Sequence, residues 1–90
     1  MASYLAEIEV MLKPLVNDPQ GLAVLDGLKN LGFAGAQRVR VGKRIEVTLE
    51  APSAESAEAS ITEMCRQLLA NQVIEDFRFD LAEVAVAAGD

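Results

Sequence analysis

The chain has 90 residues, with 8 basic and 14 acidic side chains, so its formal net charge is −6. The apolar fraction of 51% with only 4% aromatic residues predicts one small domain with an aliphatic core, and it excludes a disordered chain. The negative charge disfavours nucleic acid and anionic membrane as partners, and a single cysteine excludes an internal disulfide. No apolar run could span a membrane, and Glu7 and Glu9 interrupt any signal peptide, so we expect a cytoplasmic protein.

The first predicted elements are a strand and a helix. Residues 4–12 alternate, with apolar side chains at even positions and Glu7 and Glu9 on the opposite face, as is typical of a half-buried strand. Asp18-Pro19 predicts a helix start, because aspartate caps free amides and proline fits the first helical position. Gly32 is expected to end this helix. Its apolar stripe consists of Leu22, Leu25, Leu28 and Leu31.

The middle of the chain predicts a β-hairpin. Residues 37–50 alternate apolar and polar side chains, and every apolar member stands at an odd position. A two-residue loop would mix the two faces of the pairing strands. A three-residue loop over Gly42–Arg44 keeps the faces separate and sets Arg40 opposite Glu46, which favours this turn.

A second helix and a last strand complete the expected fold. The helix begins at Pro52-Ser53, the strand covers residues 73–81, and residues 83–90 are expected to form a flexible tail behind one domain of residues 1–82. The order β-α-β-β-α-β predicts an α+β, ferredoxin-like two-layer sandwich, with a four-stranded antiparallel sheet and both helices on one face. The stripe of the second helix consists of Ile61, Met64, Cys65, Leu68 and Leu69.

The residues needed for catalysis are not assembled in this sequence. It has no histidine, and Cys65 falls on a helix stripe where a buried thiol is expected. Glu75 and Asp76 are adjacent, but neighbouring strand positions point to opposite faces and cannot act as an acid–base pair. We therefore expect no catalytic residue, metal site or cofactor in this chain.

A basic cluster is the feature that most favours a binding role. Four of the eight basic residues lie between positions 38 and 44, and they enclose Gly42. One interpretation is protection of a sheet edge against unwanted pairing, and the other is contact with a partner. An RNA-binding surface would need interleaved aromatic residues, which this segment lacks. The candidate contact residues are Arg38, Arg40, Gly42, Lys43 and Arg44.

Four short stretches of the sequence resemble a known family in order and spacing. They are Asp18–Gly21, Leu31–Phe33, Val39–Lys43 with Ile45-Glu46, and Leu69–Phe77. The family is PurS, the small subunit of bacterial phosphoribosylformylglycinamidine (FGAM) synthase. The chain departs from the family pattern at Gln72, where proline is usual, and at Phe77, where tyrosine is common.

The resemblance implies a non-catalytic assembly subunit of an ATP- and glutamine-dependent ligase complex in purine biosynthesis. That complex makes FGAM from formylglycinamide ribonucleotide (FGAR), ATP and glutamine. The implied partners are a large synthetase subunit and a glutaminase subunit, which this chain would bridge while helping ammonia transfer, as a homodimer or homotetramer. The resemblance also favours partner contact for the basic cluster. The alternative is a small-ligand-binding regulatory module of the ACT type, which shares the expected element order.

Overall fold

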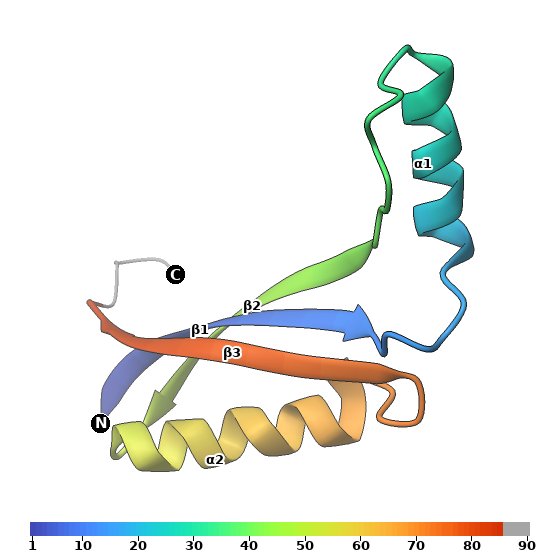
Figure 1. Cartoon of the computed structure of the whole chain (residues 1–90). Coiled ribbons are helices and arrows are strands. Elements are labelled where there is room, and N and C mark those ends of the chain that lie inside the picture. Colours follow the sequence, from blue (N-terminus) through green and yellow to red (C-terminus); the bar gives the residue numbers. More distant parts are fainter. Residues whose placement is uncertain (86–90) are drawn as a thin grey trace.

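The computed structural model describes residues 1–85, which form an antiparallel sheet, one helix packed on it and one helix standing away from it (Figure 1). The elements are β1 (Ala2–Leu12), α1 (Pro19–Asn30), β2 (Gly42–Ala51), α2 (Ala54–Met64), a short π-helix η1 (Cys65–Leu69) and β3 (Glu75–Val84). The sheet order is β2-β1-β3, with β1 in the centre and α2 across one face. The opposite face of the sheet, hereafter the open face, carries no helix.

The core lies between the sheet and α2. Ile8 and Val10 of β1 and Ile61 of α2 are completely or almost completely buried there, as is Cys65. The predicted faces of the strands are confirmed, since Glu9 lies on the open face and the even positions of β1 are buried. The flanking strands and the helical segment add half-buried residues, namely Ile45, Val47, Leu49, Met64, Leu69, Phe77, Phe79 and Leu81.

The stripe predicted for the second helix is correct at Ile61, Met64, Cys65 and Leu69 and wrong at Leu68. From Cys65 the backbone forms a π turn, in which the amide of Ala70 donates to the carbonyl of Cys65 at 3.0 Å. A π turn holds more residues than an α turn, so the side chains at and after it point in other directions than they would in an unbroken α-helix. Leu68 is therefore 82% exposed, while Ala70 is buried against the core.

The predicted start and end of the first helix are confirmed. Asp18 is the N-cap of α1, where its carboxylate accepts a hydrogen bond from the amide of Gly21 at 2.9 Å. Pro19 occupies the first helical position. Gly32 has a φ of 99° and donates to the carbonyl of Lys29, which ends the helix as expected.

The prediction that both helices cover the sheet is wrong, because α1 belongs to a projecting arm. We define the arm as α1 with residues 31–41, which return beside it towards the sheet (Figure 1). No residue of α1 contributes to the core clusters. The radius of gyration is 17.1 Å, whereas a compact chain of this length would have about 12 Å. The molecule is thus elongated, and the leucine stripe of α1 does not meet the sheet: Leu25 and Leu28 are half-buried, while Leu22 and Leu31 are exposed.

The four-stranded sheet and the hairpin at Gly42–Arg44 are also wrong. Within residues 1–85 the sheet has three strands, and Ile45 pairs with Ile8 of β1. Residues 37–41 run beside α1 and take no place in the sheet. Alternation alone misled the prediction, because extended backbone outside a sheet shows the same period of two.

Gly42 has a different role from the turn that the sequence predicted. Its φ is not positive, and it pairs with Met11 where β2 passes the end of β1. A Cβ at this position would approach the sulfur of Met11 and lie 2.6 Å from the carbonyl oxygen of Val10. Glycine is therefore needed for the close approach of the two strands.

The last strand is shifted towards the C-terminus relative to the prediction. It begins at Glu75 and ends at Val84, so Glu83 and Val84 belong to the sheet and not to a tail. Positions 86–90 of the predicted tail lie outside the described residues. In the part of the chain that is described, no helix has the length and apolar character needed to cross a membrane.

Candidate functional site

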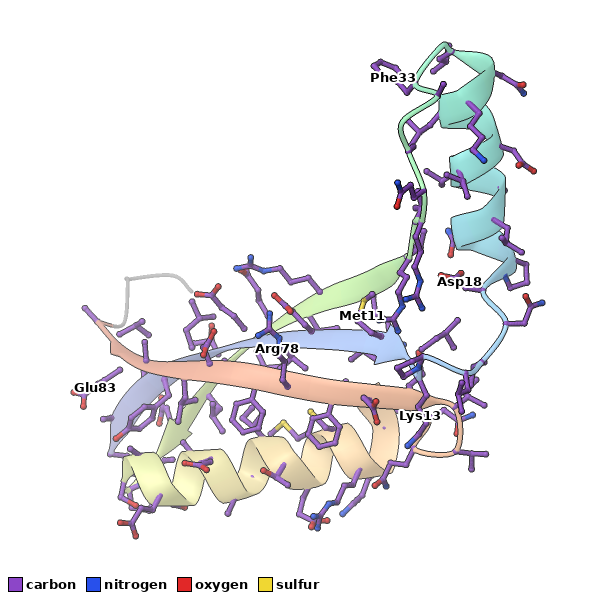
Figure 2. The ribbon with its side chains drawn as sticks, viewed as in Figure 1. Met11, Lys13, Asp18, Phe33, Arg78 and Glu83 are labelled. Carbon is purple, nitrogen blue, oxygen red and sulfur yellow. The ribbon has the colours of Figure 1, made fainter. Side chains whose placement is uncertain are left out.

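Three of the four stretches that carry the family resemblance meet at one end of the sheet, where the arm begins. We call this region the arm base and define it as residues 11–21, 38–44 and 70–76. Hydrogen bonds join its segments, since the amide of Lys13 donates to the carbonyl of Ile74 at 2.8 Å and the amide of Val41 donates to Asp18 at 3.0 Å. Figure 2 shows Met11, Lys13 and Asp18 at this end of the molecule.

Asp18 connects the two sides of the arm. One carboxylate oxygen caps α1 through the amide of Gly21, and the other accepts from the amide of Val41, 23 positions later in the chain. The hydrogen bond from Val41, followed by that from Gly21, lowers the pKa of this carboxyl below its ordinary value. Asp18 therefore holds the returning chain against the start of the helix.

Two further contacts set the geometry of the arm base. Gly21 is buried, and a Cβ there would press on the carbonyl oxygen of Val39 and lie 2.6 Å from the nearer carboxylate oxygen of Asp18. The guanidinium of Arg40 donates to the carbonyl of Leu12, the last residue of β1. Arg40 thus contacts its own chain as part of the junction between arm and sheet.

Arg44 lies on the open face, in an ion-pair network with Glu7 and Glu46. The register places Glu7 directly opposite Glu46, a like-charge pair that Arg44 bridges, at 2.9 Å from Glu46. The hydrogen bond to Glu46 and the charge of Glu7 raise the pKa of Arg44. The predicted pair of Arg40 with Glu46 is therefore wrong, and Arg44 takes the place beside Glu46.

The two remaining basic residues of the cluster point to solvent. Arg38 and Lys43 are exposed, and within residues 1–85 neither forms an ion pair. Lys43 borders a hollow of about 390 Å³ together with Asp18, Gln20 and Glu75. Arg38 borders a second hollow, of about 220 Å³, with Pro14 and Val16. All five predicted contact residues are exposed, and these two are the basic ones whose side chains form no hydrogen bond or ion pair within residues 1–85.

No group of side chains at the arm base resembles an active site. Burial raises the pKa of the Cys65 thiol, which keeps it in the unreactive protonated form. Across residues 1–85, no three cysteine or acidic side chains come together as metal ligands.

The sequence interpretation missed two groups of residues at the arm base. The bond between Asp18 and Val41 joins positions far apart in the chain, and no local pattern indicates it. Leu15 and Val73 are exposed apolar residues in tight turns, where glycine, asparagine or aspartate is more usual, so their side-chain type does not indicate a turn.

Comparisons with known proteins agree on one family. The family model for PurS, described as phosphoribosylformylglycinamidine (FGAM) synthase, matches residues 5–83. The PurS subunit of FGAM synthase from Synechocystis sp. is 51% identical over 79 residues, which cover 88% of this chain and 79% of the relative. The corresponding subunit of Bacillus subtilis is 43% identical over 81 residues, which cover 90% of this chain and 95% of the relative.

Solved structures give the same result for the fold. Bacillus subtilis PurS superposes with a TM-score of 0.81 at 42% identity and covers 89% of this chain and 99% of that structure. A chain in the structure of PurLQS from Thermotoga maritima gives a TM-score of 0.81 at 27% identity, over 93% of this chain and all of that one. The three-stranded antiparallel sheet with two helices matches these folds. The chain belongs to the PurS family, the PurS subunits of FGAM synthase in purine biosynthesis.

Proposed function

We propose that this chain is a non-catalytic assembly subunit of FGAM synthase that bridges the large synthetase subunit and the glutaminase. In this role it supports the glutamine-dependent conversion of FGAR to FGAM and assists ammonia transfer between the two partners. The observation that carries the proposal is the similarity to a chain of the PurLQS structure over almost the whole length of both chains.

The shape of the chain supports a bridging role. A subunit that joins two others needs two separate surfaces, and the elongated molecule offers the arm base at one end of the sheet and the open face along the sheet. The exposed basic residues Arg38 and Lys43 at the arm base supply a positive contact on an otherwise acidic chain. The order observed, β-α-β-α-β, also lacks one strand of the order on which the ACT-type alternative rested.

We propose further that the chain associates with copies of itself as a homodimer or homotetramer. Apolar side chains of the arm lie uncovered in the single chain, among them Leu22, Leu31 and Phe33, of which Phe33 is 60% exposed. Solvent-facing apolar residues concentrated on one element are typical of a protein interface. A second copy would cover the apolar side chains of the arm and add buried apolar surface to that of the small core of one subunit.

Reversing the charge of Lys43 or Arg38 should weaken assembly with the large subunit and leave the fold unchanged. Both side chains are exposed, so replacement by glutamate removes an attractive contact without a cost in burial. Lys29→Glu is the matched control, because it makes the same charge change near the far end of α1. Co-purification with the synthetase and glutaminase measures the effect. Equal retention of all three variants would show that the basic cluster does not contact a partner.

A further inference from the structure

Two tight turns at the arm base each carry an aliphatic side chain at the tip. The first covers residues 13–16, where the amide of Val16 donates to the carbonyl of Lys13 at 2.9 Å. Pro14 and Leu15 are its central residues, and Leu15 is 100% exposed. A leucine at the third position of such a turn gains no backbone advantage, because that position favours asparagine, aspartate or glycine.

The second turn covers residues 71–74 and is held more rigidly. The carbonyl of Asn71 accepts from the amides of Ile74 at 3.1 Å and Glu75 at 2.7 Å. The side chain of Asn71 accepts from the amide of Val73 at 3.1 Å, and the carboxylate of Glu75 accepts from the amide of Asn71 at 2.7 Å. This network leaves Val73 82% exposed at the tip.

The two turns form one preorganised unit. The bond from the amide of Lys13 to the carbonyl of Ile74 joins them, and Lys13 also pairs with Asp76 at 3.2 Å. The π turn that leads into the second turn directs a third aliphatic side chain, Leu68, into solvent. Rigid loops that hold apolar groups in water lose little entropy on binding, which is the property of a docking element.

We infer that Leu15 and Val73 anchor this chain in an apolar recess with an acidic rim on the large synthetase subunit. The inference rests on the proposed function. It adds an apolar contact to the charged contact that the basic cluster would make. The first turn borders a hollow through Pro14 and Val16, and the charged residues that line this hollow are Arg38, Arg40 and Asp18, so positive groups outnumber the one carboxylate there. A recess with carboxylates at its edge is complementary to that arrangement.

The size of the apolar surface favours a larger subunit over a second copy as the occupant. The two aliphatic side chains offer a patch of at most a few hundred Å², whereas a stable dimer buries roughly 800 Å² on each partner. Such a patch suits a small number of anchoring side chains inserted into a pocket of an otherwise wider contact. The arm, with its longer row of apolar residues, is better suited to self-association.

The test compares Leu15→Ser/Val73→Ser with Leu15→Met/Val73→Ile, which changes the same two positions and keeps them apolar. Affinity for the purified large synthetase subunit is measured by calorimetry, and the mass of the isolated chain is measured by light scattering. We expect the serine pair to raise the Kd by tenfold or more. The apolar pair should bind like the wild type, and all three proteins should have the same mass and thermal stability.

Three results would overturn the inference. The first is a serine pair that binds as tightly as the wild type, and the second is an apolar pair that loses as much affinity as the serine pair. The third is a change in the mass of the isolated chain, which would identify a second copy as the occupant of this surface. A wild-type chain that does not bind the synthetase at all would contradict the proposed function itself, and the inference with it.

Discussion

Replacing Ile61 with alanine is expected to lower the free energy of unfolding by about 2–5 kcal/mol, the range for a large-to-small change in a packed core. Ile61 is completely buried between α2 and the sheet, in contact with the buried residues of β1. The arm contributes nothing to this core, so few other residues can compensate. Since small domains have a total stability of roughly 5–15 kcal/mol, the variant should unfold at much lower urea concentration.

Leu68→Ala is the control for this prediction, because Leu68 belongs to the same stripe in the sequence. The π turn moves Leu68 into solvent, so its replacement should change stability by no more than about 0.5 kcal/mol. Urea unfolding followed by circular dichroism measures both variants. Similar losses for the two would mean that the helix continues without the π turn and that Leu68 is a core residue.

Replacing Gly21 with alanine should loosen the arm and leave the sheet folded. The added methyl group has no room between the carbonyl oxygen of Val39 and the carboxylate of Asp18, so the start of α1 must move away from the returning chain. Hydrogen exchange should then show faster exchange of the α1 amides and unchanged exchange in β1. Assembly with the synthetase should weaken as well, because the arm base loses its geometry.

Gly27→Ala is the matched control in the same helix. The space around a Cβ at Gly27 is open within the described structure, so alanine there should strengthen the helix, by about 1 kcal/mol from its higher helix propensity. Slower amide exchange for Gly27→Ala and faster amide exchange for Gly21→Ala would together show that the close packing that excludes a side chain from α1 lies at the arm base. If both variants slowed exchange, close packing at Gly21 would be contradicted.

The contact between Asp18 and the returning chain of the arm should depend on pH. The folded-state pKa of this carboxyl is lowered by its two backbone hydrogen bonds, so folding favours the charged form. The stabilisation that this carboxylate gives to the folded arm is fully present above the ordinary carboxyl pKa. It is lost as the pH falls through the lowered pKa. The α1 amides should therefore lose protection in acid before those of β1, and Asp18→Asn should weaken this pH dependence.

Local chemistry in the sequence predicts the parts of the fold that depend on neighbouring residues. The cap at Asp18, the helix end at Gly32 and the two faces of β1 follow from side-chain type and spacing, and all are confirmed. The position of the arm depends on contacts between distant segments, such as Val41 with Asp18. Hydrophobic periodicity carries no information about which surface an apolar stripe will meet, so α1 was placed on the sheet.

The roles of the candidate site residues also depend on contacts between distant segments, which the sequence does not reveal. Clustering in the sequence indicates the basic segment as a candidate surface, but only the fold separates its members by role. Arg40 and Arg44 bind groups of their own chain, while Arg38 and Lys43 remain exposed. The alternation of side chains on both sides of Gly42 predicts a hairpin turn there, whereas in the structure Gly42 permits two strands to approach closely.

The most direct test of the central claim is reconstitution of glutamine-dependent FGAM synthesis from the purified large subunit, the glutaminase and this chain. The account predicts that activity with glutamine requires all three components. Activity of the large subunit with added ammonia should persist without this chain, because in the proposed role the chain supplies assembly and no catalytic group. Glutamine-dependent activity that is the same with and without the chain would contradict the account.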